Sequence, residues 1–419
     1  MSVTAVGATG GIVQRHAERL IEEAVSDTRV ILVNGARQAG KSTLARLVAK
    51  RHDAEWRSFD DPQTLGEAKF DPRAFVVSDR MIVIDEVQRY PEILLSIKER
   101  VDTHPRPGSF LLTGSAHVMG LRSVPDRLVG RIETIELWPF SQGEIDGTPD
   151  GFIDRVFSDP LGVRANSSLT KADYAARVVT GGFPEAQARS GRRLTAFYRN
   201  YFADLVNREV RQVWEVQRAD EFLALARLAA PANSGLLVPA NLARATGLAK
   251  GTVSRYLAIL HEVFAIKIIP AWAASPSGRV LKTPKLAFVD SGLVAEVLNY
   301  DVRSLIRLSS AFGGLLESFV AMELARAATW SLTGPTLSHY RTKDGVEVDI
   351  VLQDRAGRVV GIEVKASSTV RGDDFKALRH LARRLGPDFL VGLVLYAGPT
   401  TASFGDRFRA MPISAVWEL

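Results

Sequence analysis

Cysteine is absent from this 419-residue chain, so disulfide bonds and thiolate metal sites are excluded. Long apolar runs are absent too: the longest, FLVGLVLYAG from residue 389, is about half of what a membrane-spanning helix requires and predicts a buried strand. The first residues, MSVTAVGATGGIVQRHAERL, lack the basic segment and apolar core of a secretory signal. We therefore expect a cytoplasmic protein without a membrane partner.

The composition that is present belongs to an ordinary globular protein, with 46% hydrophobic and 24% charged residues. Its length predicts about two to four domains. The net charge of +6 is compatible with a polyanionic partner, although charge alone does not identify one.

A glycine-rich loop lies between a predicted strand and a predicted helix. Residues 29–34 (RVILVN) read as a buried strand and run into GARQAGKST, which is followed by the helical pattern LARLVAK. In this context the backbone N–H groups and the helix N-terminus point at phosphate, Lys41 reaches the terminal phosphates and Ser42 ligates Mg²⁺. A glycine-rich turn with a chance lysine would not explain the order strand, loop, helix. The expected ATP-binding residues are Gly35, Ala36, Arg37, Gln38, Ala39, Gly40, Lys41, Ser42, Thr43 and Asp85.

A second apolar strand, residues 81–84 (MIVI), ends in two acids. We expect Asp85 to hold Mg²⁺ through water and Glu86 to polarise the attacking water. The alternative is a surface turn after a buried strand. A third strand, SFLLTGSA, ends in Thr113 and Ser115, and Ser115 is the predicted sensor of the terminal phosphate, on a strand between the other two.

Two arginines precede the next strand, in PDRLVGRIETIELWPFS. Either Arg127 or Arg131 could reach the nucleotide of a neighbouring subunit and stabilise charge on the transferring phosphate, which would make the protein a homo-oligomer. A surface salt bridge explains either residue equally well.

These motifs resemble the AAA+ branch of P-loop ATPases over residues 12–145. The VNGARQAGKST loop, the VIDEVQRYPEI and FLLTGSA strands and the later GGFPEA at 181–186 are similar to a large family of bacterial and archaeal ATPases that carry a carboxy-terminal domain without a known function. The resemblance implies nucleotide hydrolysis. It also implies that the helical pattern from residue 171 to 228 forms a lid over the nucleotide.

The middle of the chain has the pattern of a winged helix. LARATG predicts a helix ending in glycine, LAKG a turn, and TVSRYLAILHEV a second helix capped by Thr252; AIKIIPAW and RVLKTPKLAFVD then predict two strands around a wing. Between Asn241 and Lys285 there are seven Lys or Arg residues and one Glu, an imbalance that suits DNA, although many winged helices contact only protein. The expected DNA-binding residues are Thr252, Ser254, Arg255, Arg279, Lys282 and Lys285.

Near the carboxy-terminal end, residues 346–366 alternate apolar and polar side chains around a glycine-containing turn, which predicts a hairpin. Setting Asp354 opposite Arg358 pairs Asp349 with Glu363. The same register sets Glu347 opposite Lys365 as an ion pair. Two facing carboxylates destabilise a hairpin unless a cation lies between them.

The order of elements here, helix, strands, helix and buried strand, resembles restriction-endonuclease-like nucleases with a D…E-x-K signature. The resemblance implies that Asp349 and Glu363 bind Mg²⁺, that Glu317 on the preceding helix completes the metal shell, and that Lys365 activates the attacking water. Mg²⁺ would be the missing cation. The alternative is a remnant in which Lys365 pairs with the acids and no metal binds.

The predicted fold class is therefore α/β, with a P-loop AAA+-like parallel-sheet domain (1–146), a helical lid and linker (147–230), a winged helix (231–300) and a restriction-endonuclease-like domain (301–419). Two functions fit this architecture. One is an ATP-regulated, Mg²⁺-dependent nuclease acting on DNA. The other is an ATP-dependent regulatory switch whose carboxy-terminal domain binds DNA or a protein without cleaving.

Overall fold

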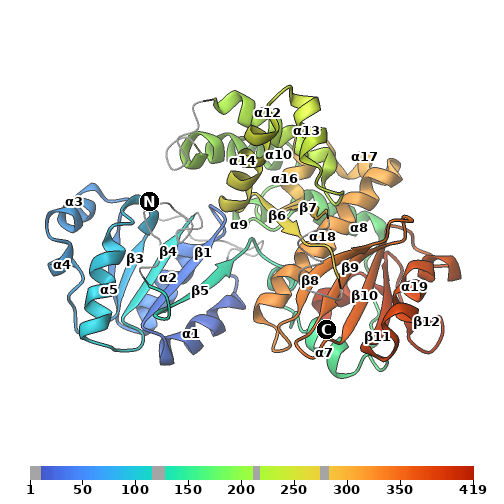
Figure 1. The fold of residues 1–419 in the computed structure, drawn as a ribbon, viewed down its shortest axis with the longest axis horizontal. Helices are drawn as coiled ribbons and strands as arrows, with labels where there is room; N and C mark the ends of the chain where they lie inside the picture. The colour runs from blue at the N-terminus through green and yellow to red at the C-terminus, as the bar shows by residue number, and fades with distance from the viewer. Residues whose placement is uncertain (1–10, 116–127, 211–217, 274–282) are drawn as a thin grey trace. The chain divides into compact units, whose positions relative to one another are not determined.

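The computed structural model describes residues 11–115, 128–210, 218–273 and 283–419 (Figure 1). The chain divides into two compact units. The first unit contains residues 1–140 and 262–264, and the second contains 141–261 and 265–419. The segments predicted as lid, winged helix and nuclease-like domain thus fall almost entirely within the second unit.

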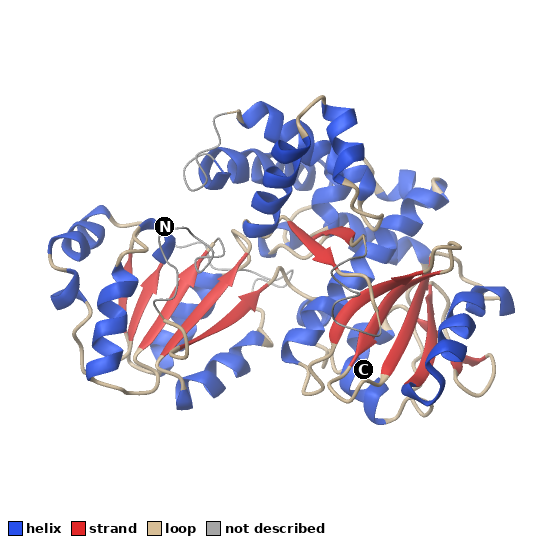
Figure 2. Ribbon diagram, viewed as in Figure 1, coloured by secondary structure: helices blue, strands red, loops and turns tan. Residues whose placement is uncertain are grey.

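The first unit is built on a five-stranded parallel sheet in the order β2-β3-β4-β1-β5 (Figure 2). Its inner strands are buried on both faces, as parallel sheets are when helices cover each side. The predicted parallel α/β sheet is therefore confirmed, and β4 lies between β1 and β3 as expected. The elements are α1 (Ala17–Asp27), β1 (Val30–Gly35), α2 (Lys41–Arg51), β2 (Glu55–Ser58), α3 (Pro62–Phe70), α4 (Pro72–Phe75), β3 (Ile82–Asp85), η1 (Val87–Arg89), α5 (Ile93–Thr103), β4 (Phe110–Gly114) and β5 (Ile132–Leu137).

The second unit begins with helices and one antiparallel strand pair, β6-β7. The predicted helix ending in glycine is present: α13 stops at Gly247, which has the left-handed φ of 72°. The next helix starts at Lys250, so Thr252 lies inside its first turn and the expectation that Thr252 caps it was wrong. The elements are α6 (Gln142–Asp146), α7 (Phe152–Ser158), α8 (Lys171–Thr180), α9 (Pro184–Gln187), α10 (Gly191–Asp204), η3 (Leu205–Val210), α12 (Ala219–Ala229), η4 (Ala230–Ala232), α13 (Pro239–Thr246), α14 (Lys250–Glu262), β6 (Ile266–Ile269) and β7 (Lys285–Phe288).

The rest of the second unit surrounds a six-stranded mixed sheet in the order β12-β13-β11-β10-β9-β8. The predicted apolar strand is β11, paired in parallel with β10, and its residues are almost all buried. No helix in the described ranges is long and apolar enough to cross a membrane. The elements are α16 (Ser291–Val297), α17 (Val302–Arg307), α18 (Ser309–Trp330), β8 (Thr336–Arg341), β9 (Glu347–Gln353), β10 (Val359–Lys365), η5 (Gly372–Phe375), α19 (Lys376–Leu385), η6 (Gly386–Asp388), β11 (Phe389–Tyr396), β12 (Ala402–Ser403), β13 (Phe408–Pro412) and α20 (Ala415–Glu418).

Candidate functional site

The glycine-rich loop connects the end of β1 to the start of α2, as its sequence predicts. A side chain at Gly35 would overlap the backbone carbonyl of Leu137 on the neighbouring strand, so only glycine fits there. Gly40 precedes α2 with a φ of 97°, which favours glycine at the turn into the helix. The loop is further fixed by the buried Arg15, which donates to the carbonyls of Ala39 (2.8 Å) and Trp138 (2.7 Å) and was not predicted from the sequence.

Lys41 and Ser42 connect the loop to the acidic end of β3. The Lys41 ammonium lies within the loop and donates to the carbonyls of Gly35 (3.0 Å) and Ala36 (2.9 Å). Ser42 Oγ donates to Asp85 Oδ1 over 2.8 Å. A serine hydroxyl beside a carboxylate is a donor set that suits Mg²⁺ bound together with a nucleotide's phosphates. The predicted ligands Ser42 and Asp85 are therefore adjacent.

The two acids at the end of β3 are held differently. Asp85 also accepts a hydrogen bond from Thr113 Oγ1 (2.5 Å), and the same hydroxyl accepts one from the backbone N–H of Glu86 (3.1 Å). Glu86 has a φ of 60°, a left-handed conformation that is rare outside glycine and clusters at functional sites. Burial raises the pKa of Glu86, and the nearby charge of Asp85 raises it further. A raised pKa suits a group that takes a proton from water.

Gln88 is a candidate site residue that sequence reasoning missed. Its amide donates to Ser115 Oγ (2.7 Å) and to the carboxylate of Glu86, so it joins the predicted water activator to the predicted sensor. The Gln88 side-chain oxygen is buried without a hydrogen-bond partner in the described part of the chain. The sequence signal was present, because Gln88 follows the acidic pair by two residues on the turn after β3.

Of the two predicted arginines, Arg127 lies outside the described residues. Arg131 forms an ion pair with Asp102 at the end of α5. Arg131 directly precedes β5, and the first residue of β5 pairs with the first residue of β1. Arg131 therefore lies at the amino-terminal end of these parallel strands, whereas the glycine-rich loop follows their carboxyl end. In the structure Arg131 therefore forms a surface salt bridge, which was the alternative to a role at a neighbour's nucleotide. Action on a neighbour's nucleotide would require this pair to break.

Comparison with known proteins gives a family match at the same place. Residues 27–146 match the family model described as AAA domain. Residues 27–146 form an AAA-type ATPase domain. The matched residues include the glycine-rich loop, the acidic end of β3 and the whole parallel sheet. Two other models, both described as domains of unknown function, match residues 171–304 (DUF8612) and 312–416 (DUF4143).

Relatives and solved structures resemble longer parts of the chain. Uncharacterized proteins Rv2008c of Mycobacterium tuberculosis and Mb2031c of Mycobacterium bovis are each 28% identical over 364 residues, which is 85% of this chain and 75% of the relative. The Walker-type ATPase PABY2304 of Pyrococcus abyssi is 13% identical with a TM-score of 0.42, covering 68% of this chain and 96% of that one. AMPPCP-bound DnaA of Aquifex aeolicus is 18% identical with a TM-score of 0.32, covering 62% and 92%.

In the second unit, strands β9 and β10 form the predicted hairpin. Ile362 pairs with Ile350, and this register continued by one residue sets Asp349 opposite Glu363. The Asp349 carboxylate accepts a hydrogen bond from the Val364 backbone N–H over 2.9 Å. The structure therefore brings the two acids of the hairpin together as the sequence indicated.

The cation beside these acids is a lysine from another strand. Lys285 Nζ lies 2.6 Å from Glu317 Oε1, 2.6 Å from Glu347 Oε1 and 4.0 Å from Asp349 Oδ1. Lys365 pairs instead with Glu363, over 3.2 Å. The predicted ion pair between Glu347 and Lys365 is therefore wrong. Glu347 points to Lys285 and Arg341.

The electrostatics of the carboxylate cluster (Glu317, Glu347, Asp349, Glu363) follow from burial and mutual repulsion. Burial and the charge of Asp349 raise the pKa of Glu317 to about 7 and that of Glu363 to about 8. Burial alone would lower the pKa of Lys285, but Glu317 and Asp349 outweigh burial and raise it. Lys285 is therefore a permanent cation.

The predicted Mg²⁺ ligands do not fit a metal in this arrangement. Across the described ranges, no group of three or more His, Cys, Asp or Glu side chains is arranged to hold a metal ion. Glu317, Asp349 and Glu363 are close to one another, but the Lys285 ammonium contacts the first and approaches the second.

The predicted DNA-binding residues separate into three groups. Ser254 and Arg255 are exposed on the first turns of α14, and Thr252 beside them is half-buried. Arg279 and Lys282 lie outside the described residues. The expectation that Lys285 contacts DNA from a wing is wrong. Lys285 is the first residue of β7, and its side chain is buried among carboxylates.

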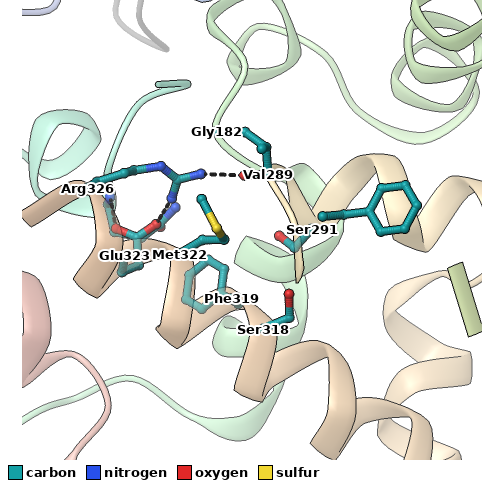
Figure 3. A pocket seen from close by; sticks show the side chains of 10 residues that line it. Gly182, Val289, Ser291, Ser318, Phe319, Met322, Glu323 and Arg326 are labelled. Atoms are coloured by element: carbon teal, nitrogen blue, oxygen red, sulfur yellow. Dashed lines mark hydrogen bonds and ion pairs between the residues drawn. The ribbon is translucent and has the colours of Figure 1, made fainter. Parts of the chain in front are cut away.

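The GGFPEA motif contributes to a buried junction within the second unit. The Gly182 backbone N–H donates to Asp290 Oδ2 over 2.6 Å. Arg326 on α18 pairs with Glu323 and donates to the Val289 carbonyl over 2.8 Å (Figure 3). A cavity of about 10 Å³, room for about one water molecule, is lined by Gly182, Val289, Glu323 and Arg326 together with their neighbours. The junction is built for packing rather than for a substrate.

The raised carboxyl pKa values predict a pH-dependent stability. Protonation of Glu317, Glu323 and Glu363 is easier in the folded chain, so their contribution to stability is complete below about pH 4.5 and is lost as pH rises through about 7 to 8. Burial lowers the pKa of His339 to about 4, so in the folded chain this histidine is already neutral throughout the pH range in which the carboxyls titrate. We expect the unfolding free energy of the second unit to fall by roughly 3 kcal/mol between about pH 6.5 and 8.

Urea denaturation of the whole chain at several pH values, followed by near-ultraviolet circular dichroism, checks this slope. The matched variant is Asp349→Asn, because the charge of Asp349 is the second cause of the raised pKa of both Glu317 and Glu363. Its slope should be shallower than that of the parent. Equal slopes would show that Asp349 does not couple to the other carboxyls.

Proposed function

We propose that this protein is an ATP-controlled DNA-binding switch. The ATPase domain supplies the nucleotide cycle: Lys41 holds the phosphates, Ser42 and Asp85 hold Mg²⁺, and Glu86 activates water with Gln88 and Ser115 orienting it. Mg²⁺ would neutralise charge on the phosphates when bound. The residues that support this role are already joined by hydrogen bonds in the structure.

The observation that carries the DNA-binding part is an exposed basic surface around the turn between α13 and α14. Arg244, Lys250 and Arg255 are all exposed on it, and Ser254 adds a hydroxyl. The two helices precede the strand pair β6-β7, the order of a winged helix. Such helix pairs place basic side chains against phosphates and the major groove. We refer to Arg244, Lys250 and Arg255 as the basic turn.

Replacing the basic turn by alanine should weaken binding of a duplex by about tenfold or more at low salt. It should also reduce the slope of log K against log salt by roughly 0.9 for each phosphate that the variant no longer neutralises, because fewer counterions are released. Fluorescence anisotropy with a labelled duplex, over a salt series with and without a non-hydrolysable ATP analogue, measures both. A nucleotide-dependent affinity would support the switch.

The matched control replaces Arg192, Arg193 and Arg303, which are exposed on other helices of the same unit, α10 and α17. The control has the same change in net charge, so it tests whether the effect is local. If both triple variants lose affinity equally, binding is non-specific attraction to a basic protein. If neither does, the helix pair contacts protein instead of DNA.

A further inference from the structure

Lys285 is a buried lysine beside Asp349, one of the two facing hairpin acids. It is the first residue of β7, and its side chain is 4% exposed. Its ammonium contacts Glu317 on α18 and Glu347 on β9 at 2.6 Å each. A single side chain therefore joins three elements that are far apart in the sequence.

The backbone around Lys285 holds it in this place. Lys285 pairs with Ile269 on β6, and residue 236 forms an isolated bridge to its other side. The preceding carbonyls are also used: Pro284 O accepts from the Leu237 N–H over 2.8 Å, and Thr283 O lies 3.1 Å from His339 Nε2. These hydrogen bonds distinguish Lys285 from a surface lysine that moves away at little cost.

A lysine and a divalent ion compete for the same oxygens here. Mg²⁺ and Mn²⁺ require several oxygen ligands converging on one point. The ammonium already takes one oxygen of Glu317 and approaches Asp349, and its charge repels a second cation at short range. The partner of Glu363 is the ammonium of Lys365, so a second lysine also opposes a metal.

We propose that Lys285 is the resident cation of the carboxylate cluster and that it excludes divalent metal ions from it. The cluster then fastens the β6-β7 pair to α18 and β9 instead of supplying a metal for phosphodiester cleavage. This inference concerns the second unit alone and does not depend on ATP or DNA binding.

The experiment is a Mn²⁺ titration of the nucleotide-free whole chain by isothermal titration calorimetry. The parent should show no site that Asp349→Asn removes. Lys285→Met, which keeps the length of the side chain and removes its charge, should gain a Mn²⁺ site at least tenfold tighter than any in the parent. Adding Asp349→Asn to Lys285→Met should abolish this gained site. Any weak Mn²⁺ binding at the P-loop is the same in all these chains and cancels in the comparison.

Two controls separate charge from packing. Lys285→Arg keeps the cation and should gain no Mn²⁺ site. Lys267→Met alters a lysine on the paired strand β6 and should behave as the parent does. A Mn²⁺ site in the parent that disappears in Asp349→Asn overturns the proposal, even if Lys285→Met does not fold. A folded Lys285→Met without a gained site also overturns it.

Discussion

Lys41→Ala is expected to abolish tight ATP binding, whereas Glu86→Gln is expected to keep binding and lose turnover. The Lys41 ammonium lies within the P-loop, where it donates to two loop carbonyls and would meet the phosphates of bound ATP, so its removal should weaken binding by about 100-fold or more. Glu86 directly follows Asp85, the last residue of β3, and a neutral amide at this position could not take a proton from water. Glu86→Gln should lower kcat by about 100-fold or more.

Equilibrium binding of a fluorescent ATP analogue and steady-state phosphate release measure the two effects separately. Each variant has a control of the same chemistry at an exposed position. Lys50→Ala alters the far end of the same helix as Lys41, and Glu92→Gln alters an exposed acid shortly after Glu86. Both controls should match the parent. If Glu86→Gln hydrolyses ATP as fast as the parent does, Glu86 is not the residue that activates water. Gln88 and Ser115 would then orient the water without a base.

The ATPase domain could be predicted in detail because its signals are local. The strand, the glycine spacing and the start of α2 all lie within residues 29–51. Each of these patterns restricts the local backbone conformation without a contribution from distant residues. The third strand was placed between the other two from its terminal hydroxyls, and β4 lies there. Gln88 was missed because its role depends on a hydrogen bond to Ser115, 27 residues later in the chain.

Lys285 shows where sequence reasoning fails. A count of charges treats every lysine of residues 241–285 as solvent-exposed, but burial of this one depends on Glu317 and Glu347, both distant in the sequence. The hairpin pattern raised the correct question, since it set Asp349 opposite Glu363 and required a cation. The hairpin holds only half of the answer: Lys365 pairs with Glu363, whereas the ion pair of Asp349 is with Lys285 from another strand.

The same limit explains the incorrect pairing of Glu347 with Lys365. Cross-strand opposition predicts neighbours when no third group competes for them. In the fold, both side chains have other partners. Glu347 pairs with Lys285, and Lys365 pairs with Glu363.

Gly181→Ala is expected to destabilise the second unit strongly, although Gly181 carries no chemistry of its own. Gly181 ends α8 with φ 68° and ψ −161°, a combination that only glycine adopts readily. An added methyl group would overlap the Asp290 carboxylate and the Tyr198 hydroxyl, both buried. Strain and overpacking together should lower the unfolding free energy by roughly 3–5 kcal/mol.

The matched control is Gly247→Ala, at the end of α13. Gly247 has nearly the same φ, 72°, but nothing lies within 4 Å of the added carbon. It should cost only the left-handed strain of about 1 kcal/mol. Gly247 has a ψ of 5° and Gly181 one of −161°, so the difference between the two variants in urea denaturation at one pH measures the packing at the GGFPEA junction together with the extra backbone strain of Gly181. Equal losses would mean that Asp290 and Tyr198 move aside freely, and that the motif's glycine is needed for backbone conformation alone.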